Sequence, residues 1–388
     1  MALIKDYFEK TKRYMEEYGE NTIVLMQVGA FFEVYGLTDS DGQIDSGTSQ
    51  ITKFSIICDL NVVDKRVCCG PNPVVMAGFK DHLLDKYVKK IQDAGFTVVV
   101  FEQDEQCANT TRSLTGIYSP GTYFSSDPET ITNNVCCVWI ETKKPPTRSR
   151  FFAKGATDKP YIYVGAGIVD IFTGTSSIME FKEIYIKNPT TFDELERFMS
   201  VHNPLETIIV TNVPKCELED IISYANIQSK TVHIVDLNLD PKAYRNVARA
   251  ANCEKQKYQS ELLMQFYTAA STDIVSFMNI FVDNVYATQA ICYLLDFVYQ
   301  HNPNLVYKIA EPTLENTNKR LILANHSLEQ LNIINTNDSS YRGPYSSVLK
   351  MLNQCVTPMG RRRFSQNFLN PTTDEYYLQT EYNILKVL

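Results

Sequence analysis

The feature that most constrains the fold of this 388-residue sequence is a change of hydrophobic pattern along the chain. Up to about residue 270, short apolar runs typical of buried strands alternate with segments whose apolar residues recur at helical spacing. From Ser271 onward the helical spacing dominates and few strand signals remain. Strands mixed with helices predict α/β domains, whereas the last part of the chain predicts an all-α region.

This pattern predicts an α/β multidomain protein with three parts. We expect a small mixed α/β domain at 1–128, a second α/β domain at 129–272, and a helical region at 273–388 that is incomplete because the sequence stops in a helical stretch. The clearest predicted elements are a helix at 3–19, strands at 23–28, 31–35 and 96–103, a helix at 81–95, and a strand with a glycine-bearing turn at 161–174. Prolines and charges at 141–160 predict a surface loop.

Charge and cysteine content limit the classes of function. The net charge is −8 and the pI is about 5.3, so any nucleic-acid binding would need a local basic face. The ten cysteines include no C-x-x-C pair, and no secretory signal precedes them, which is typical of reduced intracellular thiols. No apolar run approaches the length that spans a bilayer, so we expect an intracellular protein with no membrane partner.

The stretch QVGAFFEVYG, residues 27–36, carries the most unusual combination of side chains. In an extended strand, Phe31 and Glu33 share one face and Phe32 points to the other. An aromatic ring beside a carboxylate is unusual for a core, although core packing is the simpler interpretation of so short a pattern. An exposed Phe31 could instead wedge between base pairs from the minor groove, at least cost where the base is already mispaired.

Glu33 fits a DNA site in two ways. Phosphates repel a carboxylate unless it accepts a hydrogen bond from a base N–H. Alternatively, a protonated Glu33 would donate its proton to a ring nitrogen of the base. The sequence leaves both open.

Six segments in order along nearly the whole chain resemble motifs of the MutS family of DNA mismatch-repair proteins. They are QVGAFFEVYG at 27–36, PVVMAGFKDHLLDKYVKKIQDAGFTVVVFEQ at 73–103, SPGT at 119–122, VGAGIVDIFTG at 164–174, LILANHSLEQLNI at 321–333 and SSVLKMLNQCVTPMGRRRF at 346–364. The resemblance implies an N-terminal portion of such a protein. It assigns a mismatch-binding domain, an inactive connector domain with an RNase H-like fold, and the beginning of a helical core.

The resemblance also implies roles for individual residues. Phe31 matches the intercalating wedge, Glu33 the base-contacting carboxylate and Phe32 their buried neighbour. A turn at Met76, Ala77 and Gly78 and the nearby His82 match a loop of the mismatch-binding domain. The implied DNA-binding set is Phe31, Glu33, Thr52, Lys53, Met76, Gly78 and His82.

The sequence departs from the family pattern in three places. Ala30 replaces a usual Asp, Lys80 replaces a usual Pro, and residues 58–72 form an atypical insertion. These departures affect the detailed DNA contacts that the resemblance implies, while the wedge residue itself is present.

Two further groups have alternative interpretations. Arg361, Arg362 and Arg363 could bind phosphate, but arginines on a core helix usually pair with carboxylates. Asp170 could belong to an RNase H-type metal site, but it has no evident carboxylate companions and is better explained as a turn former. The five histidines, at 82, 202, 233, 301 and 326, lie in unrelated contexts and predict no catalytic arrangement.

No G-x-x-x-x-G-K-[ST] motif is present, so we expect no ATPase activity and no cofactor in this chain. The resemblance places ATP and Mg²⁺ binding, and most self-association, in other domains of the complete family protein. The expected partner is double-stranded DNA with a mismatch or small loop, and a MutL-like protein is a further candidate. MutS-like proteins occur in bacterial cytoplasm, nuclei, organelles and large viruses, so the compartment stays open.

Two alternative functions remain open from the sequence. One is a MutS-like protein that binds branched DNA or serves as an interaction scaffold, although proteins of that type usually lack the F-x-E pattern. The other is a nuclease, against which the missing carboxylates argue.

Overall fold

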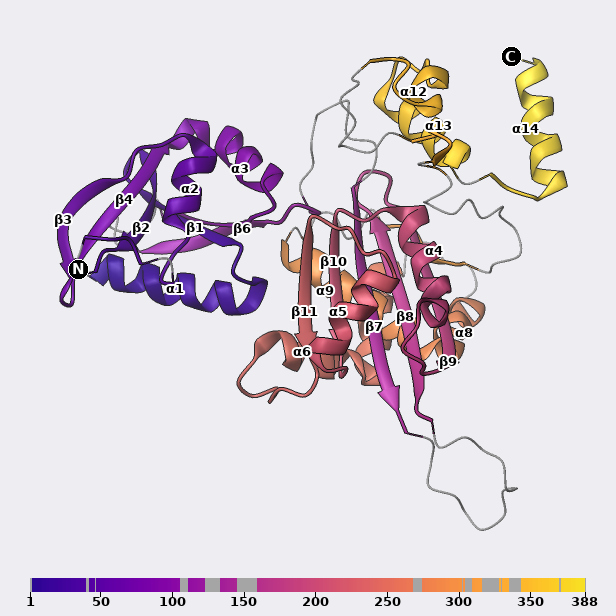
Figure 1. The fold of residues 1–388 in the computed structure, drawn as a ribbon, viewed down its shortest axis with the longest axis horizontal. Helices are drawn as coiled ribbons and strands as arrows, with labels where there is room; N and C mark the ends of the chain where they lie inside the picture. The colour runs from indigo at the N-terminus through magenta and orange to yellow at the C-terminus, as the bar shows by residue number, and fades with distance from the viewer. Residues whose placement is uncertain are drawn as a thin grey trace, which may run out of the picture.

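The computed structural model contains two mixed sheets with helices on their faces, followed by separate helices toward the C-terminus (Figure 1). No helix among its described residues is both long and apolar enough to cross a membrane. The structure describes residues 2–39, 42–45, 47–104, 111–122, 133–144, 159–267, 274–301, 303, 309–315, 328, 330–334, 343–369 and 371–387.

The first sheet has six strands in the order β3-β4-β2-β1-β5-β6. Only the β1–β5 pair is parallel; the other neighbours are antiparallel. Val24, Leu25 and Met26 are all buried, because helices cover both faces of the sheet. The strands are β1 (Thr22–Val28), β2 (Phe31–Leu37), β3 (Val63–Cys69), β4 (Asn72–Lys80), β5 (Thr97–Gln103) and β6 (Arg112–Tyr118).

Helices cover the two faces of the first sheet (Figure 1). On one face, α1 (Ala2–Tyr18) packs Tyr7 edge-on against Tyr35, with ring centroids 4.9 Å apart. On the other, α2 (Ile51–Cys58), η1 (Asp81–Leu83) and α3 (Leu84–Asp93) cover Phe32 and Phe79. The predicted helices at 3–19 and 81–95 and the predicted strands of this sheet are confirmed.

One expectation for this sheet was wrong. Met76, Ala77 and Gly78 lie inside strand β4 and form no turn. The residues of the atypical insertion form β3 and the hairpin turn at Gly70, whose φ is +65°. β3 and β4 pair with each other, which makes this insertion an edge hairpin of the sheet.

The second sheet also has six strands, in the order β11-β10-β7-β8-β9-β12. β10 pairs in parallel with both β7 and β11, and β8 pairs antiparallel with β7 and β9. The predicted loop at 141–160 begins inside β7, and residues 145–158 lie outside the described part of the chain. The strands are β7 (Asn134–Lys143), β8 (Tyr161–Asp170), β9 (Ser176–Ile184), β10 (Glu206–Thr211), β11 (Thr231–Asp236) and β12 (Thr313–Leu314).

Helices lie on both faces of this sheet as well (Figure 1). One face is covered by α4 (Asp193–His202), preceded by η2 (Pro189–Phe192), and by α5 (Lys215–Tyr224). On the other face lie α6 (Arg245–Cys253), α7 (Gln256–Tyr267) and α9 (Val285–His301).

The approach of α9 explains the glycines of the VGAGIVD stretch. A Cβ atom at Gly165 would lie 2.1 Å from the backbone carbon of Tyr286, and one at Gly167 would lie 3.0 Å from the Cα atom of Ile291. Only glycine lets the helix backbone come this close to the strand.

The described C-terminal part is mostly helical, although strand β12 shows that the predicted region at 273–388 is not all-α. It contains α8 (Ile274–Asp283), α12 (Val348–Leu352), α13 (Pro358–Leu369) and α14 (Glu375–Val387). Two elements of the predicted third region, α9 and β12, pack on or pair with the second sheet. Most of the LILANHSLEQLNI segment, residues 321–327 and 329, lies outside the described part of the chain.

Candidate nucleic-acid interface

Phe31 and Phe32 begin strand β2 and point in opposite directions. A tight turn at Gly29, with φ +59°, precedes them. The Phe31 side chain is 45% exposed, whereas Phe32 is 2% exposed and packs 6.0 Å from the ring of Phe79. The predicted alternation is confirmed, and the core interpretation of Phe31 is wrong because only Phe32 of the two is buried.

Glu33 lies on the same face as Phe31 but is only 7% exposed. Its Oε2 atom accepts a hydrogen bond of 2.5 Å from the Tyr35 hydroxyl and lies 2.6 Å from the Nζ atom of Lys65. Burying a carboxylate is costly unless such partners are present. The sequence alone did not indicate Lys65, which lies in the insertion that departs from the family pattern.

Gly78 leaves the space that Glu33 occupies. It pairs with Glu33 across β2 and β4. A Cβ atom at Gly78 would lie 2.6 Å from the carbonyl oxygen of Phe32 and 3.3 Å from the Cγ atom of Glu33. The position therefore requires a glycine if β2 and β4 are to keep this spacing.

Met76 precedes Gly78 on strand β4, and His82 follows the end of this strand in η1. Met76 pairs with Tyr35 and is half-buried on the Glu33 face. His82 is exposed on η1, next to Asp81, whose backbone N–H donates to the carbonyl oxygen of Ala30 in the turn before Phe31. Phe31, Glu33, Met76, Gly78 and His82 thus belong to one region of the first sheet.

Thr52 and Lys53 lie elsewhere. Both are exposed on α2, which covers the opposite face of the sheet. The Nζ atom of Lys53 lies 5.6 Å from the ring centroid of Phe96. Phe96 precedes β5, whose first residues pair with the first residues of β1, at the end of the sheet far from Phe31. The structure does not bring these two residues to the wedge.

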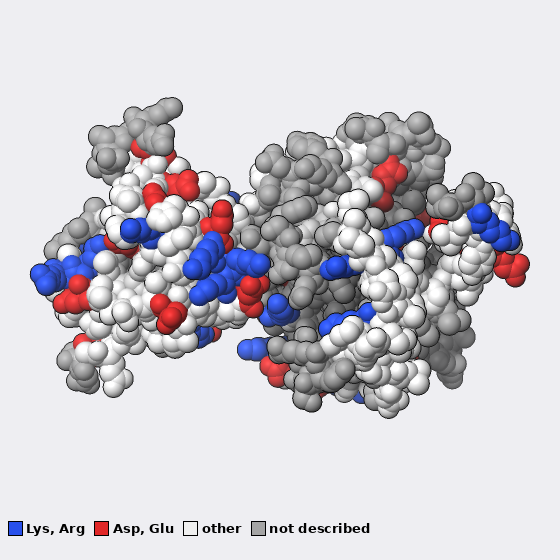
Figure 2. Space-filling model, turned by 90° about the horizontal axis from the view of Figure 1, so that it is seen from above, with Lys and Arg blue, Asp and Glu red and all other residues white. Residues whose placement is uncertain are grey.

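Lysine and arginine side chains gather on the first unit near its border with the second (Figure 2). Lys53 of α2 and Lys86 and Lys90 of α3 are exposed. Lys80, also exposed, pairs with Phe31 across β4 and β2. An acidic chain with such local cations can approach a polyanion.

The junction between the two sheets is held by a buried carboxylate. Glu206 is 0% exposed, and its Oε2 atom accepts hydrogen bonds from the Ser119 hydroxyl at 2.6 Å and the Gly121 N–H at 3.0 Å. Its Oε1 atom lies 2.6 Å from Nε2 of His233. Burial alone would raise the pKa of Glu206, but the hydrogen bond and charge of His233 lower it below its usual value. The SPGT segment is therefore a structural link to β10.

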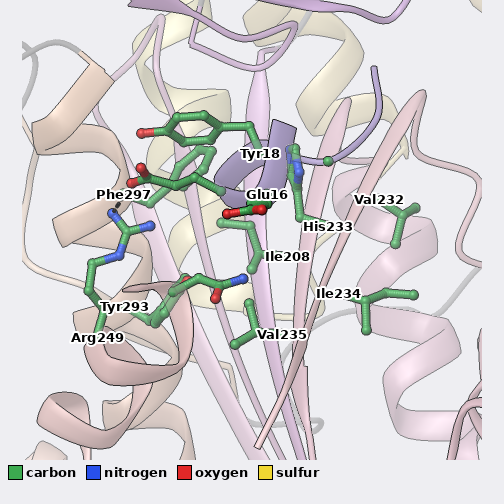
Figure 3. A pocket seen from close by; sticks show the side chains of 13 residues that line it. Glu16, Tyr18, Ile208, Val232, His233, Ile234, Val235, Arg249, Tyr293 and Phe297 are labelled. Carbon is green, nitrogen blue, oxygen red and sulfur yellow. Dashed lines mark ion pairs between the residues drawn. The ribbon is translucent and has the colours of Figure 1, made fainter. Parts of the chain in front are cut away.

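A cavity of about 120 Å³ opens beside this link, between the end of α1 and strands β10 and β11 (Figure 3). Arg249 lines it and lies 3.7 Å from the carboxylate of Glu17 on α1. His301, at the end of α9, is 5% exposed, and burial lowers its pKa to about 4. The Arg249–Glu17 pair joins α6 to α1 across the cavity, so the cavity belongs to the contact between α1 and the second sheet.

Asp170 forms a turn. Its carboxylate accepts hydrogen bonds of 2.9 Å from the backbone N–H of Phe172 and from the Thr173 hydroxyl. Glu180 accepts from the backbone N–H groups of Tyr286 and Ala287 at the start of α9. Within the described ranges, no group of three or more His, Cys, Asp or Glu side chains is placed to hold a metal ion.

The arginines of α13 have partners other than carboxylates. Arg361 Nε donates to the carbonyl oxygen of Cys355 at 2.9 Å, and Arg363 donates to the Tyr377 hydroxyl at 3.1 Å. Both contacts are within the C-terminal helices. The side chain of Arg362 lies outside the described part of the chain.

Comparison with known proteins points to one family. Residues 3–127 match the model of MutS domain I. The chain is 27% identical to a mutS homologue of Acanthamoeba polyphaga mimivirus, an alignment that covers 95% of this chain and 33% of that protein. It is 22% identical to the mitochondrial DNA mismatch repair protein mutS homologue of Sarcophyton glaucum, over 98% of this chain and 40% of the relative.

A third relative is the DNA mismatch repair protein MutS of Fervidobacterium nodosum, 23% identical over 96% of this chain and 36% of the relative. The chain thus spans little more than a third of the length of these relatives. The match to domain I covers the first sheet with Phe31 and Glu33, and the alignments cover nearly all of the chain. Residues 3–127 thus match domain I of the MutS family, and nearly the whole chain is similar to MutS homologues.

Proposed function

We propose that this chain recognises mispaired or looped DNA in mismatch repair, by inserting Phe31 from the minor groove while Glu33 contacts a base. The observation that carries the proposal is the opposite placement of two adjacent phenylalanines. Phe32 is buried and anchors β2, so the 45%-exposed Phe31 is held on a rigid strand and faces outward. A wedge needs such support, because unstacking a base step costs a few kcal/mol.

The relatives support the same role, since their names include DNA mismatch repair. In the whole protein we propose that ATP and Mg²⁺ binding, self-association and contact with a MutL-like partner involve other domains. The second sheet with its helices is proposed to be the connector, RNase H-like in fold and without nuclease activity. This chain alone is proposed to have no ATPase activity.

The test is binding of the chain to two duplexes at low salt, one fully paired and one with a single G·T mispair. Wild type is expected to prefer the mispair, and Phe31→Ala is expected to lose about 1–3 kcal/mol of that preference, the usual contribution of an aromatic stacked on a base. Ile56→Ala is the matched control, because Ile56 is an exposed apolar side chain, 75% exposed, on the opposite face.

Equal binding of both duplexes by wild type, unchanged by Phe31→Ala, would contradict the proposal. Binding that favours a four-way junction over the mispaired duplex would instead support the branched-DNA alternative. Phe31 and Glu33 argue against that alternative, because MutS-like proteins of that type usually lack the F-x-E pattern.

A further inference from the structure

Strand β3 brings a cation to Glu33 from the edge of the first sheet. β3 pairs with β4, and the pairing is interrupted by a bulge between Asp64 and Cys68. Arg66, inside the bulge, has φ +60°, and its backbone N–H donates to Asp64 Oδ1 at 2.7 Å. A non-glycine residue in this conformation is uncommon and is retained where the surroundings demand it. Lys65, its neighbour, reaches Glu33 from this irregular segment.

The ion pair is sheltered from water. The side chain of Lys65 is 26% exposed and that of Glu33 is 9% exposed, with 2.6 Å between Nζ and Oε2. The Lys65 Nζ atom also lies 5.6 Å from the ring centroid of Tyr35. Lys65 therefore occupies a defined position, unlike a lysine of an open surface.

Two donors, the Tyr35 hydroxyl and the Lys65 ammonium, contact the Glu33 carboxylate. Burial raises the pKa of the Tyr35 hydroxyl, and the hydrogen bond to Glu33 raises it further, so Tyr35 remains a donor. Tyr7 of α1 and Arg112 of β6 also act electrostatically on Tyr35. Burial raises the pKa of Tyr7 to about 12, so it too stays neutral. Lys65 is thus the cation in direct contact with the carboxylate.

We propose that Lys65 is a specificity-determining residue of the mismatch site, because its ammonium, 2.6 Å from Glu33, positions that carboxylate to accept a hydrogen bond and so selects bases whose ring nitrogen carries a hydrogen. The inference rests on the proposed function and decides between the two roles that the sequence left open for Glu33. Both observed contacts use Oε2, so Oε1 is the oxygen that would meet the base.

The selection follows from base chemistry. Thymine and guanine carry a ring N–H on their pairing edges, whereas adenine and cytosine carry a bare ring nitrogen there. A carboxylate placed against that ring position accepts from thymine and guanine. It is repelled by the bare ring nitrogen of adenine and cytosine, because two acceptors cannot share a proton that neither holds. The ammonium also cancels the carboxylate charge beside the phosphates, which lowers the cost of bringing Glu33 to DNA.

The experiment compares affinity for two duplexes, one with a single unpaired thymine and one with a single unpaired adenine, between about pH 8 and about pH 5.5. Wild type and Lys65→Arg are expected to prefer thymine by about tenfold throughout, the worth of one well-placed hydrogen bond to a charged group. In Lys65→Met the buried Glu33 loses its counter-ion and takes up a proton as the pH falls. Its thymine preference is then expected to collapse toward unity at the acid end.

Lys80→Met is the matched control. It removes a lysine of the neighbouring strand that pairs with Phe31, so it changes overall affinity while leaving the thymine-to-adenine ratio flat with pH. A double variant, Glu33→Gln with Lys65→Met, covers the case in which the single variant unfolds. It leaves no buried charge, and a pH-independent ratio near unity is expected.

The outcomes separate the two proposals. A Lys65→Met ratio that matches wild type at every pH, with mismatch binding intact, overturns the role of Lys65 and leaves the wedge standing. If wild type binds the fully paired and the thymine-inserted duplex equally, both the proposed mismatch site and the role of Lys65 are contradicted. A loss of affinity in Lys65→Met that leaves the thymine-to-adenine ratio unchanged at every pH also contradicts the inference.

Discussion

Two adjacent residues of the same type have opposite roles in this chain. Phe32 is buried against Phe79, and a fully buried phenylalanine contributes about 1.5–3 kcal/mol to stability. Phe31, 45% exposed, contributes much less to the fold and leaves an apolar ring facing solvent. A free ring next to the buried Glu33–Lys65 pair is understandable if the ring is reserved for a binding partner.

The close pairing of β2 and β4 at Gly78 predicts that a larger residue there destabilises the fold. Gly78→Ala places a methyl group 2.6 Å from the Phe32 carbonyl oxygen, so β2 and β4 must move apart. We expect a loss of about 1–3 kcal/mol in the free energy of unfolding, the usual cost of overpacking. Urea denaturation measures it, with Met76→Leu as the control because that exchange nearly conserves volume on the same strand. A variant as stable as wild type would show that the strands tolerate the change.

Among the secondary-structure elements, those with a clear hydrophobic pattern in the sequence were predicted best. β1, β2 and β5 are apolar runs of strand length, and α1 and α3 have their apolar residues at helical spacing, so the sequence alone predicted them. Alternation along β2 separated Phe31 from Phe32. β3 was not predicted as a strand because the insertion carries charges, cysteines and a Gly-Pro turn, which hide a strand at the sheet edge. β4 was not predicted because a turn was expected at residues 76–78 within it.

The remaining part of the site depends on contacts between distant segments. Lys65 meets Glu33 across 32 positions of sequence, and a bulge sets which β3 side chain points there. No local pattern encodes that register. Likewise, Thr52 and Lys53 resemble a DNA-contact motif locally, but the sheet order places them on the face opposite to Phe31.

For the whole molecule, the contact between the two sheets depends on buried titratable groups. His301 lies at the end of α9, with its ring centroid 5.2 Å from that of Tyr18 on α1. Its Nδ1 atom lies 2.7 Å from the carbonyl oxygen of Phe297, and its Nε2 atom is buried without a hydrogen-bond partner. Burial lowers its pKa to about 4, so the folded state holds His301 neutral.

This arrangement predicts acid lability. Because the pKa of His301 is lower in the folded state than the usual 6.5, its contribution is fully present above about pH 6.5 and is lost as the pH falls toward 4. The loss amounts to about 3 kcal/mol at the acid end. His301→Phe keeps a ring there and removes the titration, so its Tm is expected to fall less than that of wild type over this range.

The control for that measurement is His82→Asn, since His82 is exposed and its removal leaves the slope unchanged. Thermal unfolding followed by circular dichroism at several pH values provides the comparison. Identical pH profiles of wild type and His301→Phe would contradict the assignment of acid lability to His301.

The most direct measurement of the central claim is the fluorescence of 2-aminopurine placed next to a single G·T mispair, titrated with the chain. Stacking quenches this base, so insertion of Phe31 predicts a rise in fluorescence with wild type and with Ile56→Ala, and no rise with Phe31→Ala at saturating concentrations. An equal rise with Phe31→Ala, or binding by wild type with no rise, would contradict the wedge.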